Sequence, residues 1–426
     1  MNIKINELKK VLNSPIITWL LVLFIVFNAF VIYQNSYFKD ELKVLNKLVD
    51  RFGYKIDDEM LGKFKEYYDE QLYRLNEITN KKLSKNFKNM QEFYNDHKYG
   101  LKEIYTQAEI DLIVELGIIE TYYNEILGID EIYSKINIMD IAESEIMKYS
   151  LGGKAAATVR KQYKAFSERF KQLIENKEHK YLFFMGQVYR MHSLLFRKLF
   201  RIIIFEIIIL VVLTTAYLVN YEFDSNTELL TYTSKRGRNL IIDKLWASVF
   251  SSLVITTIIL SITLSLYFKV FDYSRLWNVP ISSYFNSEYV DISSGISLLY
   301  FAWWNMSFIK YLIFSIGLIY LITLIFNGIA FVLAIHVKNT YFSFFIFAII
   351  FGLFLIVPNF LPRNSNLIFM GAFTPFFLIL NPHVWFMESG AFTTFKYYEL
   401  ITVSIWFLIL LVLGMLSIKK FKRQDI

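Results

Sequence analysis

Six blocks of about 20 apolar residues recur along this 426-residue chain, and no other feature restricts its fold so strongly. A helix of about that length crosses the hydrocarbon core of a bilayer, and it satisfies its backbone polar groups internally. Hydrophobic residues make up 55% of the chain and the mean hydropathy is +0.38, which excludes an ordinary soluble globular protein. The predicted spans are residues 15–33, 202–219, 245–268, 308–337, 341–357 and 399–418.

The first and the weakest apolar segments need separate interpretation. The first follows Lys9 and Lys10, as the core of a signal peptide would, but it is too long and lacks a small-residue cleavage site. We therefore expect a retained transmembrane anchor. A further apolar piece, residues 367–380, is interrupted by Pro375 and is too short to span. A re-entrant or interfacial segment is expected there, before the last span.

Residues 34–201 form a long polar stretch between the first two spans and are predicted to fold as a helical domain. Apolar side chains recur there every three or four residues, with charged residues between them. Such stripes are typical of helices that pack on each other, which we favour over a partner-binding groove. The pair Gly152-Gly153 predicts a break between helices, and one long helix is expected from Thr158 into the second span. No strand-like alternation is found, so an all-α integral membrane protein is predicted.

Positive charges near the spans set the predicted orientation. Basic residues outnumber acidic ones before the first span and after the last. Both ends are therefore expected in the cytoplasm, which fits an even number of spans. The domain of residues 34–201 is then extracellular, and the loop of residues 221–244 is cytoplasmic. Arg197, Lys198 and Arg201 favour the opposite arrangement, but long loops cross the membrane largely regardless of charge.

Several kinds of chemistry are disfavoured by what the chain lacks. It has no cysteine, which excludes disulfides and thiolate metal sites. The GxxxxGK[ST], HExxH and GxSxG motifs are absent, and the five histidines are too scattered in sequence to indicate a metal site. The net charge of +7 is explained by membrane topology, because no nucleic-acid-binding module accompanies it. We expect no catalytic residues, no metal ion, no cofactor bound by this chain and no nucleic-acid partner.

Glu206 lies about one turn inside the second span, where a carboxylate is costly. It marks either a substrate or proton site, or a side chain that snorkels or pairs with Arg201 or Lys198 near the interface, and we favour the second interpretation. In the polar domain, Glu178 and His179 are expected on a solvated helix face.

In the predicted inner loop, residues 221–244, an acidic start, an apolar centre and a basic turn follow one another. The residues concerned are Glu228, Leu229, Leu230, Tyr232, Arg236, Gly237, Arg238 and Lys244. This loop resembles the cytoplasmic loop of ABC-2-type transporter permeases. In that family an acidic residue opens a short amphipathic helix, and a basic, glycine-containing turn leads into the next span.

Other segments are similar to the same family, and the resemblance covers the six spans and their loops but not residues 34–201. The matching segments are residues 7–12, like its interfacial helix before the first span; residues 381–386, like the end of its re-entrant segment; residues 419–425, a common ending; and residues 280–285 with 303–306, like one Gram-positive branch.

The resemblance implies a permease subunit of an ABC exporter that moves an amphiphilic substrate outward, with a peptide or antimicrobial as the favoured class. ATP and Mg would be bound by separate ATPase subunits, so this chain would not itself be an enzyme. The ATPase would dock on the loop, with Leu229, Leu230 and Tyr232 as buried anchors. Arg236 and Arg238 would contact ATPase carboxylates or inner-leaflet lipid. A second permease subunit, identical or different, would complete the complex in the plasma membrane of a bacterium, with a Gram-positive one favoured.

Two other classes of protein are weighed against this one. A membrane sensor or structural protein would bind a ligand with its extracellular helical domain, and its spans would only transmit. A membrane-embedded enzyme is disfavoured because no set of polar residues converges in the sequence.

Overall fold

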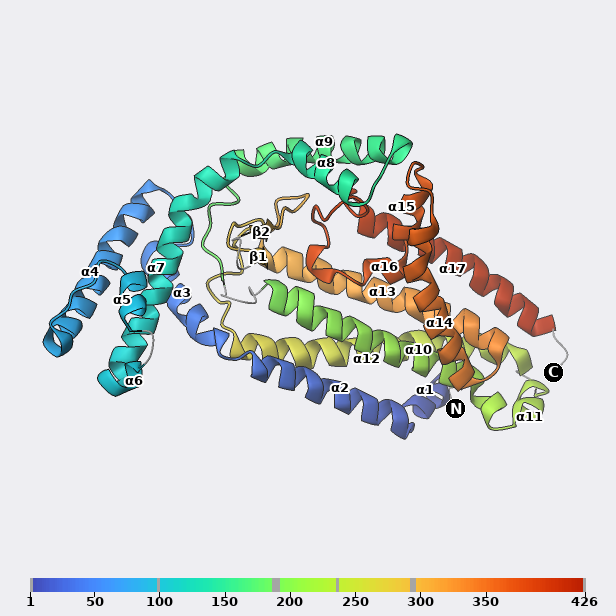
Figure 1. The fold of residues 1–426 in the computed structure, drawn as a ribbon. Helices are drawn as coiled ribbons and strands as arrows, with labels where there is room; N and C mark the ends of the chain where they lie inside the picture. Colours follow the sequence, from blue (N-terminus) through green and yellow to red (C-terminus); the bar gives the residue numbers. More distant parts are fainter. Residues whose placement is uncertain (1–2, 98–99, 186–191, 235–236, 292–295, 424–426) are drawn as a thin grey trace.

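The computed structural model describes the chain except for residues 1–2, 98–99, 186–191, 235–236, 292–295 and 424–426. Six of its helical segments are long and apolar enough to cross a membrane, as predicted. These segments are α2 (Pro15–Gln34), η1 (Ser193–Leu199) with α10 (Phe200–Asp224), η2 (Gly237–Asn239) with α12 (Leu240–Val270), α13 (Phe308–Val337), α14 (Thr340–Ile356) with η3 (Val357–Phe360), and α17 (Tyr398–Arg423). Of these, α2, α10, α12 and α13 run side by side (Figure 1).

Helices α10 and α13 form the centre of this bundle. Most residues of α10 and α13 are buried by the neighbouring helices, whereas most residues of α2, α14 and α17 are not buried. α10 contacts α2, α12, α13 and α14. The exposed faces carry large apolar side chains such as Phe345 and Leu408, which suit lipid or a second membrane subunit.

Small polar side chains join the buried faces of the spans. Asn327 on α13 donates to Thr215 on α10 (2.7 Å) and to Ser252 on α12 (3.0 Å). Thr256 and Thr323 share a hydrogen bond of 3.1 Å between α12 and α13. Because apolar burial does not favour helix contact over lipid contact, such bonds, each worth about 1 kcal/mol or less, help to fix which helix faces meet.

Between the first two spans the chain forms a helical insertion domain. Its helices are α3 (Phe38–Phe52), α4 (Asp58–Leu83), α5 (Met90–Asp96), α6 (Leu101–Ile104), α7 (Gln107–Ser134), α8 (Ile138–Lys148) and α9 (Gly153–Glu175). The apolar stripes form the domain core, where Leu45, Phe64 and Leu116 are buried. The predicted break at Gly152-Gly153 is confirmed, since it separates α8 from α9.

Helices α3 to α7 of the insertion domain lie beyond one end of the bundle, whereas α8 and α9 run along one side of it (Figure 1). The domain is bonded to loops of the bundle. Arg169 on α9 donates through Nε to Ala302 O (3.1 Å), and the Tyr163 hydroxyl donates to Glu388 (2.5 Å). These acceptors belong to the loops that precede α13 and α17. The domain is therefore held by the later spans as well as by the two that flank it in sequence.

The predicted long helix from Thr158 into the second span is wrong. α9 ends at Glu175, and Lys177 has a left-handed backbone, with φ of 54°. Residues 176–179 form a turn, and residues 180–185 then return as an extended segment whose backbone bonds to that of residues 54–56. The second span starts anew beyond this segment.

Glu178 and His179 are 1% and 2% exposed, so the expectation of a solvated face is also wrong. Glu178 forms a two-bond ion pair with Arg169 (2.6 and 2.9 Å), and the His179 ring stacks on Tyr133 at 4.3 Å between centroids. Burial, together with the charge of Lys180, lowers the pKa of His179 to about 4. Glu178 and His179 therefore belong to the buried core of the domain, just after the end of α9.

Among the described residues, a pair of short strands departs from the helical fold. β1 (Ser287–Asp291) and β2 (Ile296–Leu299) pair antiparallel in the loop between the third and fourth spans. Runs of four or five residues are too short for alternation to stand out in a sequence. In the same loop residues 280–285 and 303–306 come together, with Ile281 N donating to Met306 O (2.8 Å).

Residues 367–380 form two short helices, α15 (Leu367–Ala372) and α16 (Pro375–Leu378), and η4 (Pro382–Val384) follows them. α16 contacts α14 and α17. Its Phe376 ring lies 4.7 Å from that of Phe354 and 5.4 Å from that of Phe326. This packing among spans fits a re-entrant segment, whose depth in the membrane stays a prediction.

Candidate functional site

The connection between the second and third spans is shorter than the predicted inner loop, because both flanking helices extend into it. α10 continues to Asp224, and α12 begins at Leu240. Between them lies α11 (Glu228–Tyr232), which Glu228 opens as the loop pattern predicts. Arg236 lies outside the described residues.

α11 has one exposed face and one buried face. Leu229 and Leu230 are 61% and 79% exposed. Tyr232 is buried, and its ring lies 5.3 Å from that of Phe421 on α17 and 5.7 Å from that of Phe223 on α10. Two of the three predicted anchors are therefore accessible to a partner, whereas Tyr232 fastens α11 to its own chain.

The turn after α11 depends on Gly237. Its φ of +47° lies in the left-handed region that favours glycine, and a Cβ there would stand 3.0 Å from Tyr232 O. The neighbouring Arg238 donates through Nη1 to Lys422 O near the end of α17 (2.8 Å). The turn thus joins the α10–α12 connection to the last helix.

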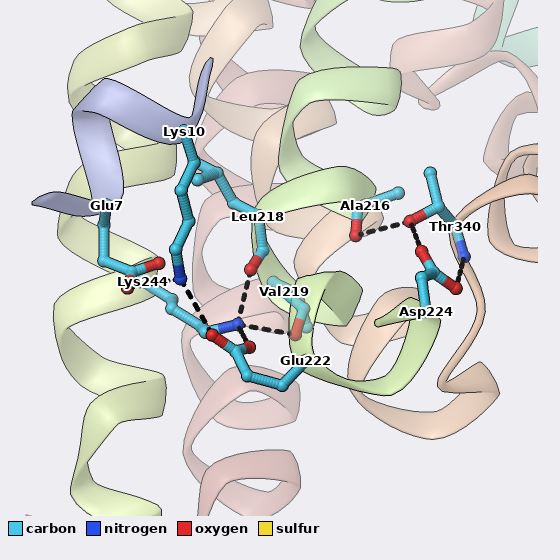
Figure 2. A network of polar contacts seen from close by, with 9 residues as sticks. All are labelled: Glu7, Lys10, Ala216, Leu218, Val219, Glu222, Asp224, Lys244 and Thr340. Atoms are coloured by element: carbon cyan, nitrogen blue, oxygen red, sulfur yellow. Dashed lines mark hydrogen bonds and ion pairs between the residues drawn. The ribbon is translucent and has the colours of Figure 1, made fainter. Parts of the chain in front are cut away.

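Behind α11, four charged side chains from three helices form a network (Figure 2). α1 (Ile3–Leu12) supplies Glu7 and Lys10, α10 supplies Glu222 and α12 supplies Lys244. Lys10 Nζ lies 2.8 Å from Glu222 and 2.7 Å from Glu7. Lys244, which is fully buried, pairs with the other oxygen of Glu222 and donates to two backbone carbonyls of α10 at 2.6 and 3.0 Å.

The network balances two ammonium groups against two carboxylates. Burial alone lowers the pKa of Lys10, but its hydrogen bonds to Glu222 and Glu7 outweigh burial and hold the pKa above its usual value. Lys10 is therefore charged at pH 7. Removing one member of a buried pair leaves an uncompensated charge, which costs about 3–5 kcal/mol. The network accordingly ties α1, α10 and α12 together beside α11.

A second polar link joins α10 to α14 (Figure 2). The Thr340 hydroxyl donates to Asp224 Oδ2, and the Thr340 backbone N–H lies 3.4 Å from Asp224 Oδ1. Because Thr340 is the first residue of α14, the carboxylate also lies at the positive end of that helix dipole.

The loop pattern identifies α11 but not what supports it. It places Lys244 among accessible basic residues, whereas in the structure Lys244 belongs to α12 and its side chain is buried against α10. It gives no indication of Glu7 or of the pairing between Lys10 and Glu222, which lie 212 residues apart. The only local signal is the presence of charged residues at the ends of apolar blocks.

Glu206 contacts the first span instead of a nearby basic residue. Asn28 on α2 donates through Nδ2 to Glu206 Oε2 (2.7 Å) and to Thr263 Oγ1 on α12 (3.2 Å). Arg201 donates to Asn381 (3.2 Å). The favoured interpretation, that Glu206 snorkels or pairs with Arg201 or Lys198 near the interface, is therefore wrong, because its side chain is 5% exposed and bonded to Asn28.

Across the described part of the chain, no group of three or more His, Asp or Glu side chains is placed to hold a metal ion. The features gathered in this structure are structural ion pairs, one intramembrane carboxyl junction and an exposed apolar helix. None of them forms a recognisable catalytic arrangement among the described residues.

The fold and this site define a multi-pass helical membrane protein, with an insertion domain between its first two spans and a short exposed helix between its second and third. No protein-family model matches the chain, and no curated protein or solved structure is significantly similar to it.

Proposed function

We propose that this protein is the membrane-spanning subunit of an ABC exporter and that a separate ATPase docks on α11. The observation that carries the proposal is the outward placement of Leu229 and Leu230 on a helix whose other side is fastened to the chain. The sequence has no phosphate-binding loop, so work would come from another subunit. Exposed apolar side chains on a short helix are suited to a groove on a partner.

The ion network supports the same proposal by making the base of α11 stiff. Thr227 N, just before α11, donates to Glu222 O (2.8 Å), and Glu222 is the centre of the network. A displacement of α11 would therefore be passed to α1, α10 and α12. In a flexible loop the same displacement would be lost in backbone rotation.

The proposed substrate is amphiphilic, with a peptide or antimicrobial as the favoured class, moved outward across the plasma membrane of a Gram-positive bacterium. The ATPase subunits would bind ATP and Mg. A second permease subunit, identical or different, would cover part of the exposed apolar surface of α2, α14 and α17, and lipid the rest. The insertion domain would be extracellular and both termini cytoplasmic, and resistance to antimicrobial peptides is one role such a complex would serve.

The rival proposal is a membrane sensor or structural protein whose insertion domain binds a ligand. A groove of about 1060 Å³ between α3, α5 and α7 favours it. Exposed apolar side chains lie along this groove, among them Tyr37, Tyr94, Val114 and Ile132. The groove is compatible with an exporter as well, so the presence of an ATPase partner separates the two proposals.

The test is co-purification of the ATPase, with an ATPase assay, for Leu229→Asp and Leu230→Asp. A charge desolvated at either position costs about 3 kcal/mol, which is over a hundredfold in affinity. Leu127→Asp is the matched control, because Leu127 is 53% exposed on α7, far from α11 in the fold. We expect both loop variants to lose the ATPase and the control to keep it. Retention of the ATPase with unaltered transport in both loop variants would overturn the docking proposal and favour the sensor.

A further inference from the structure

The junction between Glu206, Asn28 and Thr263 joins the first span to the rest of the bundle. Glu206 is 5% exposed, and Asn28 and Thr263 are fully buried. In the described residues, the two bonds donated by Asn28 are the side-chain hydrogen bonds that connect α2 to other spans. α2 has no charged residue, and its attachment otherwise depends on apolar contacts.

Two oxygens at this junction have no hydrogen-bond donor. Glu206 Oε1 and Asn28 Oδ1 are both buried, and no donor reaches either of them in the part of the chain that the structure describes. An ionised carboxylate only accepts, so ionised Glu206 would leave both oxygens unpaired. An unpaired buried polar group costs about 1–3 kcal/mol, and more if it is charged.

Among the residues that the structure describes, no cationic side chain is placed to neutralise Glu206. On α10 the next charged residue toward the insertion domain is Arg201, about 7.5 Å away along the helix axis and bonded to Asn381. On α12 Lys269 lies six residues, or about 9 Å, beyond Thr263, and its side chain is exposed.

The remaining neighbours supply no closer charge. Glu222 and Asp224 of α10, and Asp243 and Lys244 of α12, lie at the opposite ends of those helices from Glu206 and Thr263. The basic residues of α13 are Lys310 and His336, near its two ends, and α14 has no charged residue. None of the described residues therefore neutralises Glu206, which leaves the solution as a source of the neutralising charge.

We propose that Glu206 binds a proton and that its junction with Asn28 and Thr263 is a proton site that holds α2 on the bundle. A proton taken from water onto Oε1 turns this oxygen into a donor. Asn28 Oδ1 is the unpaired acceptor on the amide that already donates to Glu206 Oε2. Acid and amide are then bonded in both directions, and no net charge is buried.

Loss of the proton to water has a mechanical consequence. The carboxylate then keeps one donor, and its charge is uncompensated among three spans, which favours entry of water and separation of α2 from α10 and α12. The attachment of the first span becomes sensitive to protonation of a single residue. This inference does not depend on whether an ATPase binds α11.

The test is infrared spectroscopy of the full-length protein in lipid at pH 7, comparing the parent with Glu206→Gln. We expect a protonated-carboxyl stretching band in the parent that is missing in Glu206→Gln. Glu143→Gln is the control, because Glu143 is exposed and paired with Arg160 (2.6 Å), so the band must remain in it. No difference between the parent and Glu206→Gln would overturn the proposal.

A metal cation in place of the proton is distinguished by exchanging potassium for sodium at fixed pH. The proton site predicts no change in the band or in the unfolding temperature of the parent. A sodium-dependent shift that Glu206→Gln abolishes would overturn the proposal. If Glu206→Gln does not fold, Asn28→Leu replaces it: removal of the amide must shift the band of Glu206, and an unshifted band would overturn the proposal too.

Discussion

His179 shows at the scale of one residue what burial does to a titratable side chain without a charged partner. Its ring stacks on Tyr133, and its Nδ1 atom has no hydrogen-bond partner in the described structure. Its neighbour Glu178 has an arginine partner at 2.6 Å. The two consecutive residues are therefore buried in different states, one neutral and one charged, and sequence position alone does not separate them.

Lowering the pH from about 6.5 to about 4 should lower the unfolding temperature of the protein. The unfolded chain binds a proton on His179 near pH 6.5, whereas the folded protein, with a pKa of about 4, does not. The unfolded state therefore binds more protons in this window, and stability falls as the pH falls. Thermal unfolding of His179→Phe, which keeps a ring on Tyr133, should depend less on pH than that of the parent. An equal dependence of unfolding temperature on pH in the two proteins would contradict the prediction. His192 is also buried, with a pKa of about 4, but it is present in both proteins and does not affect their difference.

The spans are the elements that could be predicted best from the sequence. The fourth block was located at residues 308–337, which are the bounds of α13. Hydropathy works there because a span is apolar all round. It fails at the start of the second span, which begins with η1 at Ser193, nine residues before the predicted block. Arg197, Lys198 and Arg201 interrupt the apolar run but not the helix.

Contacts between distant elements could not be predicted. Periodicity identified the helices of the insertion domain, but the end of α9 is set by the ion pair of Arg169 with Glu178 and by the left-handed backbone of Lys177. At the candidate site, the exposed leucines follow from a local pattern. The network that supports them does not, since it joins α1 to α10 across the first span, the whole insertion domain and most of the second span.

At the scale of elements, Glu222→Ala should destabilise the protein by about 3–5 kcal/mol, because it leaves buried Lys244 without its carboxylate. Lys10→Ala should cost less, since the Lys10 side chain is 20% exposed and water reaches its partners more easily. Glu59→Ala is the control, because Glu59 pairs with Lys63 on the domain surface, where solvent screens the pair and its loss should change stability little. Denaturant unfolding in detergent measures all three, and similar losses for Glu222→Ala and Glu59→Ala would show that the network does not stabilise this end of the bundle.

The whole molecule has two distinct ends. Helices α3 to α7 of the insertion domain lie beyond one end of the spans, and α1, α11 and the end of α17 lie at the other (Figure 1). An even number of spans brings the two chain ends to the same side of a membrane, which agrees with the contact of Arg238 with Lys422. We predict that the end with α1 and α11 faces the cytoplasm.

Single introduced cysteines can test this orientation, because the chain has no cysteine of its own. In intact cells a membrane-impermeant maleimide should label Asn80→Cys, at the exposed end of α4, and leave Ser234→Cys, beside α11, unlabelled. Both positions should react once the cells are permeabilised. Labelling of Ser234→Cys alone in intact cells would invert the topology and remove the basis for an ATPase on α11.

The contacts of α11 with the last helix also set an order of biosynthesis. Tyr232 and Arg238 leave the ribosome well before their partners on α17. Phe421 packs on Tyr232, and the backbone oxygen of Lys422 accepts a hydrogen bond from Arg238. Until α17 has been translated and inserted, Tyr232 lacks its cover and the turn lacks its acceptor. A chain arrested or clipped before that point would carry both exposed leucines on a loop without its observed shape. Recruitment of a partner through α11 would then favour finished subunits over truncated ones.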